Sequence, residues 1–246
     1  MEAIAVSERP VLCYEPMERL LVPRPVDRLD FIAGACGGRQ VLDLGAMDET
    51  AYAHKRGQGT WLHERIAAVA KRVVGVDNAA AVPEAGLVTA ANARIVRGDI
   101  ADLSPVLAAL DFRPQVVVAG ELIEHLANPL AFLSGLARTP ALAGTTLLIS
   151  TPNATAIHNV AVGMLSREST HRDHLCVLSY KTLCTLCDRA GLGDFRLVPY
   201  RATFVEMRAR NAGLRGALVG AGERVVNGLE WLFPMLSFGW IVRASL

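Results

Sequence analysis

Short runs of consecutive apolar residues recur along the first two thirds of the chain, and each run stops at an acid, a glycine or an asparagine. Runs without polar alternation are typical of strands buried on both faces, as in a parallel sheet. Segments with helical spacing or turn residues separate them, so each strand can be followed by a crossover and a parallel strand. The runs are residues 41–44, 72–78, 93–100, 114–121 and 145–153. This alternation predicts an α/β fold.

Two further apolar runs, residues 194–200 and 238–245, can supply closing strands. We therefore expect a doubly wound, Rossmann-like, mostly parallel sheet of seven strands with helices on both faces. The chain has 246 residues, of which 52% are hydrophobic, and this suffices for one large core. We expect a single domain over residues 1–246, with a helical segment over residues 1–38 and a helical insertion over residues 203–234.

The charge balance excludes some partners. With 25 basic and 24 acidic residues the formal net charge is +1, so no global positive field attracts phosphates, and DNA is not an expected partner. The first residues, MEAIAVSERP, lack the apolar core of a secretory signal, and no uncharged run reaches the ~18 residues of a membrane span. We expect a cytoplasmic protein without stable membrane insertion.

Five scattered cysteines argue against a disulfide framework. Cys184 and Cys187 form a CxxC pair, but a zinc site would need a second pair of ligands. Buried free thiols are therefore the favoured interpretation, with metal or redox chemistry as the alternative.

Polar residues at the ends of the expected strands indicate a ligand site, because ligands of open parallel sheets lie beyond the carboxyl ends of the strands. Asp77 suits a ribose diol, since one carboxylate can accept from both hydroxyls. Asp99 can accept from an amine such as that of adenine, and Gly45 lets the backbone approach a ligand closely. Any one of these acids alone could equally be a helix cap. The candidate cofactor-binding residues are Asp43, Gly45, Ala46, Asp77, Asn78, Asp99, Ile100, Ala119, Gly120 and Glu121.

Several motifs together resemble class I S-adenosylmethionine-dependent methyltransferases over roughly residues 39–200. They are VLDLGAMDE, VVGVDN, IVRGDI, VVVAGELIEHLANP, LLISTPN and HRDHLCVLSYKTL. A narrower likeness, in GAMDE and GTWLHERIAAVAKRVVGVDN, is to a bacterial branch often found with polysaccharide or natural-product biosynthesis. The resemblance implies S-adenosylmethionine as the cofactor, a cofactor-binding core over residues 39–152 and an acceptor cap over residues 153–178.

The first loop departs from the family pattern D/E-x-G-x-G-x-G, because residues 43–49 read DLGAMDE. Met47 and Glu49 replace two glycines, and their side chains would crowd a cofactor in the usual pose. We expect the methionine part of the cofactor to lie differently or to contact Trp61 and His63 of the following loop.

The motif GELIEHL indicates a second site. In a helix, Glu121, Glu124 and His125 would share one face, and such side chains suit a divalent cation, completed by His174 or His171. The pattern also resembles the magnesium-binding group of small-RNA 3′-terminal 2′-O-methyltransferases, which implies Glu121, Glu124, His125 and His174 as ligands of Mg²⁺ or another divalent cation.

Without a metal, His125 or His174 could act as a general base, with Glu124 against the cofactor or capping a helix. Purely structural roles are the remaining alternative. All three residues are therefore candidate catalytic residues.

Two other segments have open interpretations. His158, Asn159 and Met164 belong to an acceptor cap or to a surface loop, and His54 to Arg56 close over the cofactor or form a solvated turn. In residues 213–236, apolar side chains recur partly at helical spacing. A homodimer contact or a lid is favoured there over a helix of the core. A membrane-surface helix is disfavoured because glycines are frequent and lysines sparse.

We expect a methyltransferase (EC 2.1.1.-) that methylates a hydroxyl of a small-molecule acceptor, such as a sugar or a natural product, with a nitrogen of such a molecule as the less favoured acceptor atom. One alternative is a methyltransferase-like binding or scaffolding protein without catalysis. An RNA 2′-O-methyltransferase is disfavoured by the near-neutral charge. A nicotinamide dehydrogenase would need G-x-G-x-x-G after the first strand, which residues 43–49 do not supply.

Overall fold

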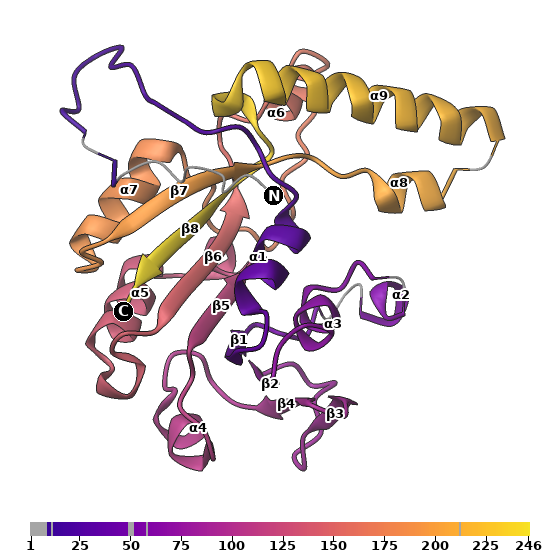
Figure 1. The fold of residues 1–246 in the computed structure, drawn as a ribbon. Coiled ribbons are helices and arrows are strands. Elements are labelled where there is room, and N and C mark those ends of the chain that lie inside the picture. Colours follow the sequence, from indigo (N-terminus) through magenta and orange to yellow (C-terminus); the bar gives the residue numbers. More distant parts are fainter. Residues whose placement is uncertain (1–8, 11, 49–51, 58, 212) are drawn as a thin grey trace.

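The computed structural model describes residues 9–246 except 11, 49–51, 58 and 212 (Figure 1). In this part of the chain one eight-stranded sheet has the order β3-β4-β2-β1-β5-β6-β8-β7. The strands from β4 to β6 are parallel, whereas β3 runs antiparallel to β4 and β8 antiparallel to both of its neighbours. The strands are β1 (Gln40–Leu44), β2 (Arg72–Asp77), β3 (Leu87–Ala90), β4 (Ala93–Arg97), β5 (Val116–Gly120), β6 (Thr146–Pro152), β7 (Phe195–Tyr200) and β8 (Gly239–Ser245). The expected doubly wound sheet is confirmed.

Helices cover both faces of the sheet. Alternate strand residues point to opposite faces, so Val41 packs with α1 and α3, whereas Leu42 packs with α4, α5 and α7. The insertion between β7 and β8 is helical, as expected, and consists of α8 and α9. The helices are α1 (Arg28–Cys36), α2 (Tyr52–Lys55), α3 (Leu62–Ala67), α4 (Ser104–Ala109), α5 (Pro129–Arg138), α6 (Ile157–Gly163), α7 (Tyr180–Arg189), α8 (Val205–Ala209) and α9 (Gly213–Leu232), with 3₁₀ segments η1 (Ile123–His125), η2 (Pro140–Leu142) and η3 (Pro234–Leu236).

Within the described part of residues 1–38, where the sequence predicts a helical segment, the only helix is α1. The described residues before it are non-helical, because four prolines between residues 10 and 25 remove backbone donors and fix φ. Asp27 then starts α1, since its carboxylate accepts from the backbone N–H of Asp30 at 3.0 Å.

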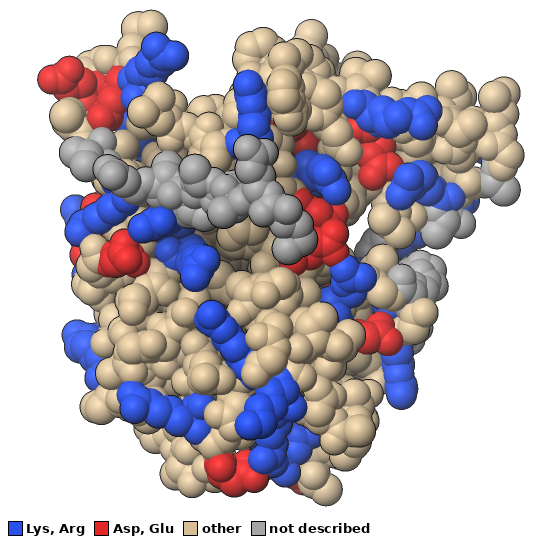
Figure 2. Space-filling model, in the orientation of Figure 1, with Lys and Arg blue, Asp and Glu red and all other residues tan. Residues whose placement is uncertain are grey.

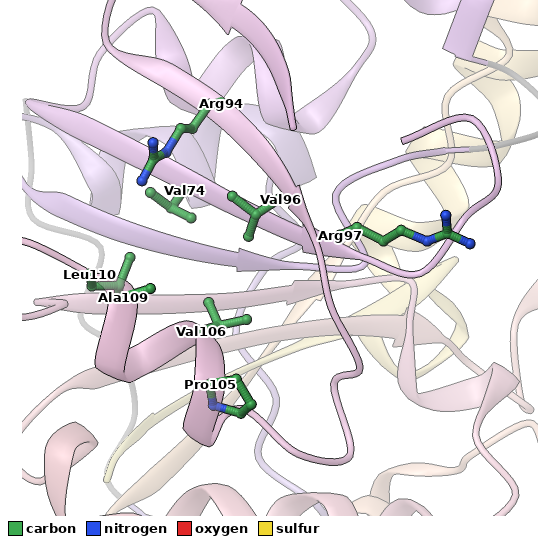
Figure 3. A pocket seen from close by; sticks show the side chains of 8 residues that line it. All are labelled: Val74, Arg94, Val96, Arg97, Pro105, Val106, Ala109 and Leu110. Atoms are coloured by element: carbon green, nitrogen blue, oxygen red, sulfur yellow. The ribbon is translucent and has the colours of Figure 1, made fainter. Parts of the chain in front are cut away.

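The strand β3 is not among the seven expected strands. Gly86, with φ +83°, turns the chain into β3, and the β-branched Val88 and Thr89 favour an extended backbone. The described chain between β2 and β4 therefore contains a strand and no helix. A cavity of about 180 Å³ lies between β2, β4 and α4, where Figure 3 shows Arg94 reaching over Val74.

The cysteine pair is buried, as expected. Burial raises the pKa of the Cys184 thiol to about 12, and it raises the pKa of the Cys187 thiol as well. Both thiols are free and protonated at neutral pH, which does not suit metal binding or redox exchange.

A glycine at the start of β8 makes room for Tyr200 of β7. A Cβ atom at Gly239 would overlap the Tyr200 ring, whose hydroxyl donates to Glu121 Oε1 at 3.0 Å. We expect Gly239→Ala to lower the free energy of unfolding by about 3 kcal/mol, because the buried ring must move. Urea titration measures this change. The control is Gly222→Ala, where a Cβ meets open space on a helix, so no loss is expected; equal losses in both variants would contradict the packing argument.

Candidate functional site

The carboxyl ends of β1, β2, β4 and β5 meet at one edge of the sheet. Leu44 pairs with Val76 on one side and with Ala119 on the other, and Asp77 pairs with Arg97. The residues expected to bind the cofactor lie at or just after these positions. The structure therefore brings them to the edge where ligands of open parallel sheets are found.

The loop after β1 is held by the end of β2. Gly45 has φ +68°, and a Cβ atom there would lie 2.9 Å from Leu122 Cδ1, so a side chain at this position would strain the loop. The carboxylate of Asp77 accepts from the backbone N–H of Met47 at 2.8 Å and of Ala79 at 2.9 Å. Each carboxylate oxygen has a second lone pair, so Asp77 can hold this loop and still accept from a ribose.

Met47 does not crowd the cofactor site in the way its replacement of a glycine suggests. Its side chain is buried in a small apolar cluster with Ala46, Trp61, Ala79 and others. Trp61 is also buried, and its indole N–H donates to the carbonyl of Ala46 at 2.9 Å. The buried Trp61 therefore supports the loop from beneath, while Glu49 lies outside the described residues.

Asp43 and His63 form a buried pair under the same loop. The imidazole Nδ1 lies 2.8 Å from Asp43 Oδ2, and Nε2 lies 2.9 Å from the hydroxyl of Thr89 on β3. Both side chains are almost inaccessible to solvent. Asp43 thus anchors β1 to α3 and β3, and His63 supports the loop in the same way as Trp61.

Removing the imidazole should destabilise the protein strongly. His63→Ala leaves the Asp43 carboxylate buried without its partner, so we expect a loss of about 3 kcal/mol in the free energy of unfolding at pH 7. The comparison is His171→Ala, which removes a half-exposed imidazole and should cost less than about 0.5 kcal/mol. Equal stability of the two variants in urea would show that the buried pair is unimportant.

Asp99, the residue expected to accept from the adenine amine, lies just after the end of β4. Asp99 is exposed, and its Oδ1 accepts from the backbone N–H of Ala101 at 2.8 Å. Ile100 lines a cavity of about 390 Å³ between α4 and α5, together with Leu107, Leu126 and other residues. Asn78 is exposed after β2, whereas Ala119 is fully buried in β5 and leaves Gly120 as the last residue of that strand.

Glu121 does not share a helix face with Glu124 and His125, so that expectation is wrong. Its backbone is left-handed, with φ +52°, and only the short η1 segment follows before Pro129 starts α5. The Glu121 carboxylate accepts from Tyr200 and lies 4.0 Å from the Arg28 guanidinium. Burial and the charge of Glu121 raise the pKa of the Tyr200 phenol well above its ordinary value, which keeps the phenol a donor.

Glu124, His125 and His174 come together beside this group. Each offers one ligand atom, and these atoms lie within 4.8 Å of one another. The chain is brought there by hydrogen bonds from the backbone N–H groups of Leu175 and Cys176 to the carbonyl of Glu124, at 2.7 and 3.2 Å. Three of the four expected metal ligands are therefore neighbours.

The protonation of this trio is set by its surroundings. Glu124 is fully buried, and neither carboxylate oxygen has a hydrogen-bond partner among the described residues. Burial, with the charge of Glu121 adding to it, raises the pKa of Glu124 to about 8. Burial and the nearby His125 and His171 lower the pKa of His174, so its imidazole is neutral at pH 7. His125 Nδ1 lies 3.1 Å from the carbonyl of Asp173, so with Nδ1 as the donor Nε2 is left to accept.

Two segments have alternative interpretations from the sequence, residues 158–164 and residues 54–56. His158 stacks on Phe238 with ring centroids 4.7 Å apart, and Asn159 donates to the carbonyl of Asn153 at 3.2 Å. Met164 is exposed. In the turn before Gly57, Lys55 pairs with Asp48 at 2.6 Å, and the His54 side chain lies outside the described residues.

Comparison with known proteins decides the family. Residues 24–195 match the family described as the methyltransferase domain. The chain belongs to this family.

Solved structures agree with this methyltransferase assignment. The S-adenosylmethionine-dependent methyltransferase of Archaeoglobus fulgidus has a TM-score of 0.50 at 15% identity, covering 89% of this chain and 94% of that one. The small RNA methyltransferase HEN1 has a TM-score of 0.55 at 14% identity, covering 94% of this chain and 26% of that one. The methyltransferase domain of a bacterial Hen1 has a TM-score of 0.51 at 15% identity, covering 89% and 97%. No curated protein matches. The fold is that of S-adenosylmethionine-dependent methyltransferases, and S-adenosylmethionine is the cofactor of this family.

Proposed function

We propose that this methyltransferase transfers a methyl group to a hydroxyl oxygen of a small molecule, such as a sugar or a natural product. The observation that carries the proposal is the meeting of Glu124, His125 and His174 just after β5, beside the edge that bears Gly45 and Asp77. That placement puts groups able to take a proton next to the expected cofactor.

The strand ends fit S-adenosylmethionine. Asp77 would accept from the ribose hydroxyls and Asp99 from the adenine amine, and the loop that turns at Gly45 would border the methionine part. The bound cofactor supplies a methyl group that its sulfonium already activates. The protein therefore has to orient the acceptor in line and accept its proton.

The imidazoles favour an oxygen acceptor. A hydroxyl must lose its proton to become a good nucleophile, whereas a neutral amine already carries a free electron pair. His174 is neutral at pH 7 because its pKa is lowered, so it can accept that proton. Glu124, with its pKa near 8, remains largely protonated at pH 7 when nothing is bound to it.

A divalent cation fits the same three residues. The Glu124 oxygens are buried and unpaired, and two imidazoles lie within ligand distance of them, whereas Glu121 is held by Tyr200 and Arg28. A carboxylate with two imidazoles suits Mn²⁺ or Zn²⁺ at least as well as Mg²⁺. Such a cation would lower the pKa of a coordinated hydroxyl.

An RNA acceptor is the second candidate, because structures named small RNA methyltransferase share this fold. Charge speaks against it. Basic and acidic side chains are interspersed over the face shown in Figure 2, and the formal net charge is only +1. A basic surface for RNA would be expected beside the reacting groups.

The test is a calorimetric titration of S-adenosylhomocysteine, followed by transfer of labelled methyl groups from S-adenosylmethionine. Acceptor arms are hydroxyl-bearing sugars and phenols, primary amines and a short RNA, each with EDTA, Mg²⁺, Mn²⁺ or Zn²⁺. We expect micromolar binding and label on a hydroxyl compound. Label on amines or RNA alone would overturn the proposed acceptor. Folded protein that binds no S-adenosylhomocysteine would overturn catalysis and favour a scaffolding role.

A further inference from the structure

The helix α9 is amphipathic in the reverse of the usual sense. Its inward side carries Glu223, Asn227 and Glu230, and its outward side carries Leu214, Leu218 and other large apolar residues. A surface helix normally buries its apolar stripe and exposes its charges. Packing within the protein therefore does not account for the apolar outward face of α9.

The inward acids fix the orientation of the helix. Glu230 is fully buried and accepts from the backbone N–H of Ala202 at 3.0 Å. Glu223 accepts from the backbone N–H of Phe204 at 3.2 Å and pairs with Arg208 at 3.0 Å. The acids thus hold the chain that leaves β7, so α9 cannot turn its apolar side inward without leaving two carboxylates unpaired.

The outward face is a stripe with an arginine on each flank. At about 100° per residue, Leu214, Leu218, Val225 and Leu232 fall within about 40° of one another. Leu214, Leu218 and Val225 are 78%, 63% and 64% exposed. Arg215 and Arg224 fall on opposite sides of this stripe, about 80° and about 100° from its centre on the same wheel. The projecting end of α9 is mainly tan in Figure 2, with blue side chains beside it.

We propose that this face of α9 adsorbs to an anionic membrane surface, with the helix in the plane of the lipid headgroups. Apolar side chains would enter the headgroup boundary while the flanking arginines reach lipid phosphates. None of the described helices is long and apolar enough to cross a bilayer, so contact through one face of a helix is the form that fits.

A second copy of the chain fits this face less well. Face-to-face packing of two α9 helices would bring arginines from both copies to one contact, and the acids of α9 point inward to their own backbone partners. Like charges without counter-charges oppose such a contact, whereas anionic lipids supply the missing charge. Lysine is sparse in this segment, but the two arginines supply the positive charge that contact with anionic lipids needs.

The test is flotation of the full chain with vesicles of phosphatidylglycerol and phosphatidylcholine in equal parts, and with phosphatidylcholine alone. We expect binding to the anionic vesicles that weakens at high salt. Leu218→Glu with Val225→Glu should lower the partition coefficient at least about 10-fold, and Arg215→Gln with Arg224→Gln several-fold. The matched control is Val88→Glu, the same exchange at an exposed position on β3, which should bind like the wild type.

Two results would overturn the proposal. One is an absence of vesicle binding, or binding that the Leu218→Glu, Val225→Glu protein retains. The other is a wild-type dimer in sedimentation equilibrium that this double variant converts to a monomer while neither protein floats. That second result would assign the face to self-association. Both readouts are independent of methyl transfer, so they do not depend on the proposed acceptor.

Discussion

Asp77→Ala is expected to weaken S-adenosylhomocysteine binding by about 100-fold or more. The loss combines two hydrogen bonds from ribose hydroxyls to a carboxylate with a looser loop at Met47, whose N–H donates to Asp77. Isothermal calorimetry measures the affinity, and urea titration shows how much of the effect is stability. The matched control is Asp111→Ala, which removes an exposed carboxylate that pairs with Arg72, near the start of β2.

A ligand analogue separates the two causes. S-adenosylhomocysteine with a 2′-deoxyribose should bind the wild type more weakly than the parent ligand does. Asp77→Ala should bind both ligands alike, because the carboxylate that tells them apart is gone. If the variant discriminates as strongly as the wild type, Asp77 holds the loop and not the ribose.

Glu124→Gln is expected to raise stability at pH 8 and to abolish any cation dependence of methyl transfer. Glutamate has an ordinary pKa of 4.5, and burial raises it to about 8 in the folded protein. The folded state therefore holds a proton that the unfolded state releases, so this stabilisation is complete below pH 4.5 and is lost as the pH rises through 8. Glutamine cannot ionise, so the variant escapes a loss on the order of 4 kcal/mol.

The measurement is Tm from pH 5 to pH 8 in EDTA, for wild type, Glu124→Gln and the exposed control Glu84→Gln. We expect the wild type to lose stability with rising pH relative to Glu124→Gln, by roughly 10 °C at pH 8. Glu230, whose pKa burial raises to about 7, changes in the same direction in all three proteins. His158 and His174 have pKa values that are lowered from 6.5, so their protonation decreases the stability as the pH falls. Parallel Tm curves for wild type and Glu124→Gln would show that Glu124 ionises normally.

The sheet and the strand-end acids could be predicted because they depend on local pattern. An apolar run that ends in Asp77 or Asp99 marks both a buried strand and its carboxyl end, and parallel pairing then brings the ends together. The helical insertion over residues 203–234, which consists of α8 and α9, followed in the same way from the spacing of its apolar residues.

The orientation of single side chains could not be predicted, because it depends on tertiary contacts. The Met47 side chain packs in a cluster whose members are spread along the chain as far as Ile95. The Glu121 carboxylate accepts a hydrogen bond from Tyr200 and does not join Glu124. Tyr200 comes near because β7 pairs with β8 and β8 pairs with β6, and neither spacing nor composition records that pairing. The inward orientation of the α9 acids could not be predicted for the same reason. Their partners are the backbone N–H groups of Ala202 and Phe204, which lie just after β7 and far from these acids in sequence.

The position of β8 in the sheet affects how the chain folds during its synthesis. β8 lies between β6 and β7, yet the whole segment 201–238 separates it from β7 along the chain. At ribosomal rates of about 5 to 20 residues per second, β7 waits roughly 2 to 8 s for the strand that joins it to β6, and β6 waits longer. During that interval both strands have open edges rich in apolar residues, which are sites of wrong pairing. A nascent chain of this protein should therefore depend on chaperones most strongly just before β8 leaves the ribosome.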